Sequence, residues 1–78
     1  MNSYIVLDVN LSDGYVKIIH LTSSSSEACD IFRKYHHELI HKGYPIKHPS
    51  NIFKDATNPR VFYYMRDDDL CRVSVVPL

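Results

Sequence analysis

The sequence lacks tryptophan, an excess of charge of either sign and any long apolar run. Nine Lys and Arg residues balance nine Asp and Glu residues, so the formal net charge is zero. Proteins that bind nucleic acids usually carry a basic excess, because neutralising phosphates supplies most of their affinity. No stretch approaches the roughly 20 apolar residues of a membrane span. These absences disfavour nucleic acids and membranes as partners.

Cysteine is scarce as well, since Cys29 and Cys71 are the only two. Small secreted domains that depend on disulfides usually carry four or more cysteines. The N-terminal stretch MNSYIVLDVN has no basic segment and no long apolar run, so it does not resemble an export signal. We therefore expect a cytoplasmic protein with free thiols, located in the host cytoplasm if the chain is viral.

What is present is a chain of 78 residues, of which 45% are hydrophobic. This length fits a single small domain, residues 1–78, with a modest core. Alternation of period two predicts strands at residues 4–9 and 15–21, with the turn dipeptide Asp13-Gly14 between them. Two further strands are predicted at residues 61–66 and 70–76. They flank the triplet Asp67–Asp69, which we interpret as a solvated hairpin turn.

A helix is predicted over residues 27–42, because apolar side chains recur there with helical spacing. Ser24 and Glu27 form a capping box, and Gly43 occupies the position of a C-terminal cap. The segment 43–60 is predicted to be a long loop that is functional or hides a short element. The order of elements predicts an α+β fold, a four-stranded antiparallel sheet (ββαββ) with one amphipathic helix packed on one face. The helical stripe consists of Ala28, Ile31, Phe32, Tyr35 and Leu39.

Inside this helix, His37-Glu38-Leu39-Ile40-His41 resembles the H-E-x-x-H motif of the zincin metallopeptidases. In that motif two histidines one turn apart share a zinc ion, and the glutamate acts as general base on the zinc-bound water. The resemblance implies a small zinc-dependent hydrolase, for which His37, His41 and His48 are the candidate metal ligands.

Several observations disfavour that enzyme. A catalytic zinc needs a third protein ligand, yet Tyr44 and Lys47 stand where the extended motif has glycine and histidine. Helical spacing also places His37 and His41 almost opposite the apolar stripe, facing water. His36, at the flank of the stripe, is predicted to pack at the edge of the core. We therefore predict no catalytic residues and no cofactor, and keep zinc as the alternative.

The chain has a high aromatic content, with six tyrosines and three phenylalanines. One helix can cover only one face of the sheet, so the other face is expected to stay open and apolar, with a ring from the run Phe62–Tyr64 pointing outward. The alternative is that segment 43–60 folds over this face and completes the core. The open face is expected to carry Val6, Ile18 or Ile19, Tyr63 or Tyr64, Val73 or Val75, and Lys17 or Arg72.

Exposed apolar patches mark protein interfaces, in which tyrosine and arginine are enriched. We therefore expect a non-catalytic protein-binding module that acts as a regulator or inhibitor, and a homodimer is compatible with the sequence. Small stand-alone domains of this style are common among phage and viral proteins that block a host enzyme or defence complex, so we expect a partner of that kind. The residues predicted to bind the partner are Tyr4, Tyr44, Ile46, Phe53, Tyr63, Tyr64 and Arg72.

A second alternative is binding of single-stranded nucleic acid. The strand VFYYMR, flanked by Arg60 and carrying Arg66, resembles the aromatic ribonucleoprotein motif, whose rings stack on bases. This strand lacks the glycines of that motif, and the neutral net charge also disfavours the alternative.

Overall fold

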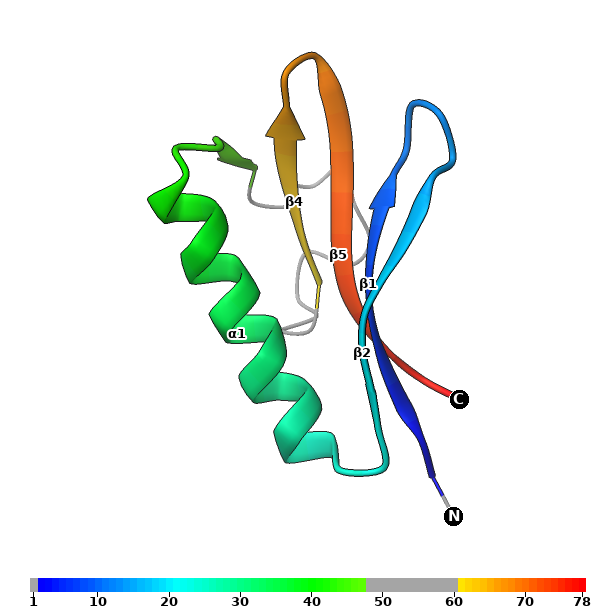
Figure 1. The fold of residues 1–78 in the computed structure, drawn as a ribbon. Coiled ribbons are helices and arrows are strands. Elements are labelled where there is room, and N and C mark those ends of the chain that lie inside the picture. Colours follow the sequence, from blue (N-terminus) through cyan, green and yellow to red (C-terminus); the bar gives the residue numbers. More distant parts are fainter. Residues whose placement is uncertain (1, 48–60) are drawn as a thin grey trace.

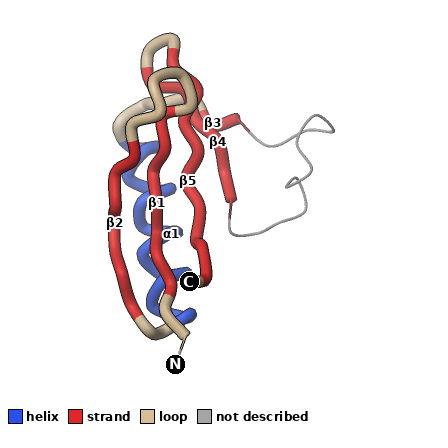
Figure 2. The backbone as a smooth tube through the Cα atoms, turned by 90° about the vertical axis from the view of Figure 1, so that its right-hand side faces the viewer, coloured by secondary structure: helices blue, strands red, loops and turns tan. Residues whose placement is uncertain are grey.

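The computed structural model describes residues 2–47 and 61–78. All strand pairings within them are antiparallel, and the strand order is β2-β1-β5-β4-β3. Figure 1 shows α1 on one side of this sheet, and Figure 2 shows the strands in front of the helix. The predicted α+β fold is confirmed, and the two-residue β3 adds a fifth strand inside the segment predicted as a loop. The elements are β1 (Tyr4–Asn10), β2 (Val16–Thr22), α1 (Ser25–His41), β3 (Ile46–Lys47), β4 (Val61–Arg66) and β5 (Asp69–Pro77).

The N-terminus of α1 makes one of the two hydrogen bonds of the predicted capping box. Ser24 Oγ accepts a hydrogen bond from the backbone N–H of Glu27 at 3.2 Å, which confirms Ser24 as the N-cap. The reciprocal bond is not made, because the Ser24 N–H donates to Thr22 Oγ1 at 3.1 Å. The Glu27 carboxylate instead lies 2.9 Å from Nε2 of His20. The start of α1 is thereby tied to the end of β2.

The C-terminal end of α1 is capped at Gly43, the glycine predicted for this role. Gly43 adopts a φ of +85°, the left-handed conformation that glycine reaches without strain. Its N–H donates to the carbonyl of Ile40 at 3.0 Å, and the N–H of Tyr44 donates to the carbonyl of Leu39 at 3.1 Å. This pair of bonds is a Schellman motif, which satisfies two of the helix's free carbonyl groups and turns the chain toward β3.

The core lies between α1 and the sheet face beneath it, which we call the inner face. The helical stripe is confirmed, since Ala28, Phe32 and Leu39 are buried and the other two members pack against the core. The ring of Phe32 meets that of Phe62 edge to face, with centroids 5.2 Å apart. In the described part of the chain α1 is neither long nor apolar enough to cross a membrane.

The face of β1 and β5 that α1 covers is the reverse of the one expected. Val6, Val73 and Val75 are buried under α1 and do not lie on the open face, so that expectation is wrong. Alternation places Ile5 and Leu7 on the opposite face, which we call the outer face. Both faces of β1 are apolar, so its pattern shows that a strand forms without showing which side is covered.

Candidate functional site

The histidines of the zincin-like motif lie on the exposed side of α1. His37, Glu38 and His41 are all exposed, as helical spacing predicts. His36 is half-buried, and its ring centroid lies 4.7 Å from that of Phe62, which confirms its place at the edge of the core. Within residues 2–47 and 61–78, no three His, Cys, Asp or Glu side chains gather as a metal site requires. His48 lies outside the described residues, and zinc stays the alternative to the prediction of no cofactor.

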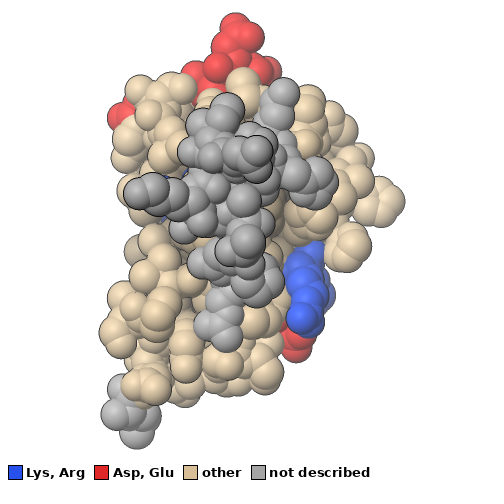
Figure 3. Space-filling view, turned by 180° about the vertical axis from the view of Figure 1, so that it is seen from behind, with Lys and Arg blue, Asp and Glu red and all other residues tan. Residues whose placement is uncertain are grey.

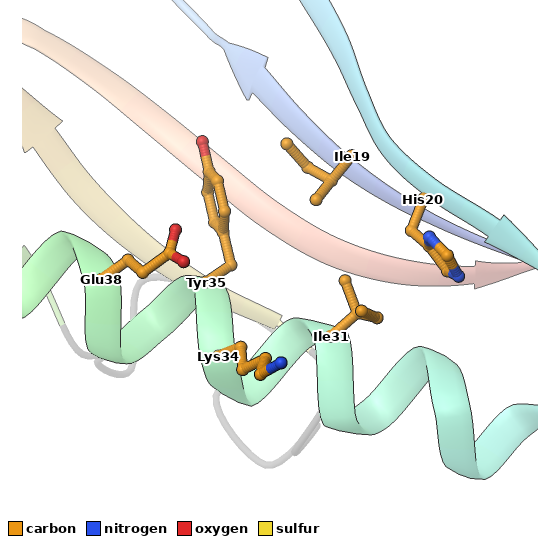
Figure 4. A pocket seen from close by; sticks show the side chains of 6 residues that line it. All are labelled: Ile19, His20, Ile31, Lys34, Tyr35 and Glu38. Carbon is orange, nitrogen blue, oxygen red and sulfur yellow. The ribbon is translucent and has the colours of Figure 1, made fainter.

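A small pocket opens between α1 and β2 (Figure 4). Its volume is about 200 Å³, below the roughly 300–1,000 Å³ typical of ligand sites. Ile19 and Ile31 provide its apolar part, and Lys34 and Glu38 bring opposite charges. His20 also lines it but is engaged by Glu27 at 2.9 Å. The volume of this pocket limits any ligand to a very small molecule.

A polar cluster is buried under α1. Asp8 is 4% exposed, and its Oδ2 accepts hydrogen bonds from the hydroxyls of Tyr35 and, at 2.6 Å, of Tyr64. Nη2 of Arg66 donates to the Tyr64 hydroxyl at 2.9 Å and lies 3.7 Å from Asp8 Oδ2. Buried charges persist in proteins when they are paired and hydrogen-bonded in this way. The cluster joins β1, β4 and α1.

The chemistry of this cluster is that of a structural network. Burial, followed by the hydrogen bond to Asp8, raises the pKa of Tyr35 and of Tyr64 far above the ordinary range for tyrosine. Burial likewise raises the pKa of the neighbouring Cys71 thiol. Hydroxyls and thiols with raised pKa values stay protonated at neutral pH, where they are poor nucleophiles and poor bases. The hydrogen bonds from Tyr35 on α1 and Tyr64 on β4 to Asp8 on β1 link the helix to the sheet.

The outer face presents apolar side chains to water. Ile18 is 63% exposed, Leu21 59% and Val16 50%, all on β2. Their cross-strand partners on β1 are apolar too, and those are half-buried. Figure 2 looks onto this face, with α1 behind the sheet. We define the outer patch as Ile5, Leu7 and Val9 of β1, Val16, Ile18 and Leu21 of β2, and Val76 of β5.

The polar neighbours of the outer patch lie on β5. Ser74 pairs with Leu7 and is buried, whereas Arg72 pairs with Val9 and is half-buried. The Nε of Arg72 is buried and has no hydrogen-bond partner among residues 2–47 and 61–78. A buried donor of this kind loses its hydration without compensation, at a cost of about 1–3 kcal/mol. Arg72 therefore places a positive charge beside an apolar surface.

Acidic side chains gather away from the outer patch. Figure 3 shows them at the end of the molecule where the two hairpin turns lie. One of these turns joins β4 to β5 through Asp67 and Asp68, with Asp67 at a φ of +55°, a conformation that aspartate tolerates in turns. The hairpin predicted around the acidic triplet is confirmed. An acidic surface thus marks this end of the molecule, whereas the side chains that define the outer patch are uncharged.

Most of the residues predicted to bind a partner lie elsewhere. Tyr63 does point to the outer face, yet it is only 4% exposed, so the expectation of an exposed ring is wrong. Tyr64 is fully buried in the Asp8 cluster. Arg72 borders the outer patch, and Phe53 lies outside the described residues. The other predicted residues, which pack half-buried against the core, are Tyr4, Tyr44 and Ile46.

Of the exposed residues of β2, Ile18 was expected on the open face only as an alternative to Ile19, and Val16 and Leu21 were missed. The reason is that β2 contains a bulge. Val6 pairs with His20 and Leu7 with Ile18, which leaves Ile19 as an extra residue. Simple alternation therefore fails along β2, and Val16, Ile18 and Leu21 reach the same face with spacings of two and then three. That change of spacing, among apolar residues on both sides of it, is the sequence signal that points to the bulge.

Comparison of the chain with models of protein families, with curated proteins and with solved structures finds no match.

Proposed function

We propose that this chain is a non-catalytic protein-binding module, and that its binding surface is the outer patch. The observation that carries the proposal is the exposure of Ile18 and Leu21, at 63% and 59%, within a contiguous apolar surface. Exposed apolar patches on small proteins commonly mark interfaces, because covering them removes apolar area from water. A module that only binds acts by occupying its partner's surface, which suits a regulator or inhibitor of a host protein.

The proposal is tested by affinity purification of the tagged chain from its native cell, with the captured proteins quantified by mass spectrometry. Ile18→Lys places a charge in the outer patch, and Ile40→Lys is the matched control, since Ile40 is 49% exposed on α1. We expect Ile18→Lys to reduce capture of the partner by about tenfold or more. Ile40→Lys should leave capture unchanged.

Equal capture by both variants would contradict the outer patch as the binding surface. Loss of capture with Ile40→Lys alone would move the interface to α1 and also overturn the proposal. Circular dichroism and urea denaturation of each variant check that the fold persists, so that a loss of capture reports binding.

A further inference from the structure

The size of the outer patch limits what can cover it. From Ile5 to Val9 the patch runs four residue steps along β1, or roughly 13 Å at about 3.3 Å per residue. Across β2, β1 and β5 it spans two strand spacings, or roughly 10 Å. An α-helix is about 10 Å wide and rises about 1.5 Å per residue, so roughly nine helical residues cover this area.

A partner reaches the outer patch from the face of the sheet and not from its edge. β2 is the edge strand beside the patch, and an edge strand can pair with another chain through its free backbone groups. Here the extra residue Ile19 interrupts the regular register of β2, and Lys17 stands exposed in the same strand. Bulges and lysines are the devices by which proteins block pairing at an edge.

Arg72 defines the charge of the partner. Among the residues that pair across the outer patch, Arg72 is the charged one, and its Nε has no hydrogen-bond partner in the described structure. Arg72 is half-buried, so a carboxylate placed over β5 would meet the positive charge of its guanidinium. Charge-assisted bonds of this kind are about twice as strong as neutral ones.

A second copy of the chain does not meet these requirements. The outer patch holds no carboxylate that a symmetric neighbour could offer to Arg72. Even with a margin of one side chain around it, the patch covers roughly 300–400 Å², against about 800 Å² per partner in a stable interface. A short segment of another protein needs no more area than this.

We infer that the outer patch binds a short amphipathic helix of a partner protein, with an apolar stripe over β1 and an Asp or Glu beside the stripe that meets Arg72. The inner face supplies the precedent within the same sheet, because α1 covers it with an apolar stripe of the same kind. The inference rests on the proposed function and adds the chemistry of the partner.

Two synthetic helical peptides of 12 residues test the inference. Both carry leucines at positions i, i+3, i+4 and i+7, and the residues flanking this stripe are glutamates in one and lysines in the other. Binding to the full chain is measured by fluorescence anisotropy. We expect the glutamate peptide to bind at least about tenfold more tightly than the lysine peptide. Arg72→Glu should reverse this preference, and Ile18→Lys should abolish the binding of both peptides.

A second variant guards against misfolding. Arg72→Gln keeps the polar side chain without its charge, and it should remove the preference for glutamate without creating one for lysine. Equal binding of the two peptides to the wild-type chain would overturn the role of Arg72. Binding of neither peptide would overturn the helix, as would a dimer in light scattering that Ile18→Lys dissociates.

The peptide result and the capture experiment fail separately. If Ile18→Lys abolishes capture from the cell while neither peptide binds, the proposed function stands and the helical partner is wrong. If the peptides bind as expected but Ile18→Lys captures as much partner as the wild type, the outer patch can bind a helix and the proposed function is wrong.

Discussion

The inner face of the sheet buries polar groups, whereas the outer face exposes apolar side chains, which is the reverse of the usual distribution. The inner face buries the carboxylate of Asp8, which two tyrosine hydroxyls and the guanidinium of Arg66 surround. The outer face leaves Ile18 and Leu21 more than half exposed. Polar groups inside a core need complete pairing, and apolar groups in water gain free energy when something covers them. The comparison teaches that the inner face maintains the fold, and it supports our proposal that the outer face binds another molecule.

The largest effect on stability should come from the centre of the inner face. Asp8→Ala leaves the buried hydroxyl of Tyr64 and the part-buried hydroxyl of Tyr35 without their acceptor, and it removes the counter-charge of Arg66. We expect the free energy of unfolding, measured by urea denaturation, to fall by about 3–5 kcal/mol. Asp30→Ala is the control, because the Asp30 side chain is 72% exposed in its pair with Arg33 and should cost less than about 1 kcal/mol. Equal losses would contradict the structural role of the cluster.

A smaller loss should follow from removing one hydroxyl of the same cluster. Tyr64→Phe deletes the donor at 2.6 Å from Asp8 and the acceptor for Arg66, and leaves the ring in place. We expect the free energy of unfolding to fall by about 1–2 kcal/mol. In the double variant with Tyr35→Phe, the losses should not add, because both hydroxyls serve one carboxylate oxygen. Additive losses would show that the two bonds act independently.

The contact that ties β2 to α1 should have a still smaller and pH-dependent effect. The hydrogen bonds from His20 and Thr22 hold the pKa of Glu27 below its ordinary value of 4.5. Because the pKa is lower in the folded state, its contribution to stability is present above pH 4.5 and is lost as the pH falls through the folded-state value. We expect Glu27→Gln to be slightly less stable than the wild type at pH 6 and equal to it at pH 2.5. A difference that grows toward acid would contradict the sign.

The smallest effect on stability should come from the outer patch itself. Ile18→Lys changes a side chain that is 63% exposed, so we expect the free energy of unfolding to stay within about 0.5 kcal/mol of the wild type. Val73→Ala on the inner face should cost about 2 kcal/mol, since Val73 is fully buried. A large loss with Ile18→Lys would show that Ile18 supports the fold, and the two faces would no longer differ as described.

The fold was largely readable from the sequence because its local signals agree. Ser24 and Gly43 mark the two ends of α1, and the acidic turn marks the hairpin of β4 and β5. These signals act within a few residues of chain, so they do not depend on what packs where. The short β3 was not located, because two residues carry no periodicity and their pairing with β4 depends on a partner distant in sequence.

The proposed binding surface was harder to predict from the sequence, because its position depends on which face of the sheet α1 covers. In β1 the side chains on both faces are apolar enough to be buried. Asp8 favours the wrong assignment, since a carboxylate is expected in water and not under a helix. Its burial becomes favourable only when Tyr35 and Tyr64 donate to it, from elements 27 and 56 residues away. Likewise the bulge at Ile19 in β2 is defined by its register with β1. Such long-range pairings are not encoded in any local window of sequence.

The most direct test of the outer patch as the binding surface is a methyl NMR titration. The full chain, with labelled Ile, Leu and Val methyl groups, is titrated with the partner recovered in the capture experiment. We expect shift changes at the methyl groups of Ile18, Leu21 and Leu7, and none at the buried Val6 and Val73 of the inner face. Shifts confined to α1, with the outer methyl groups unchanged, would contradict the account.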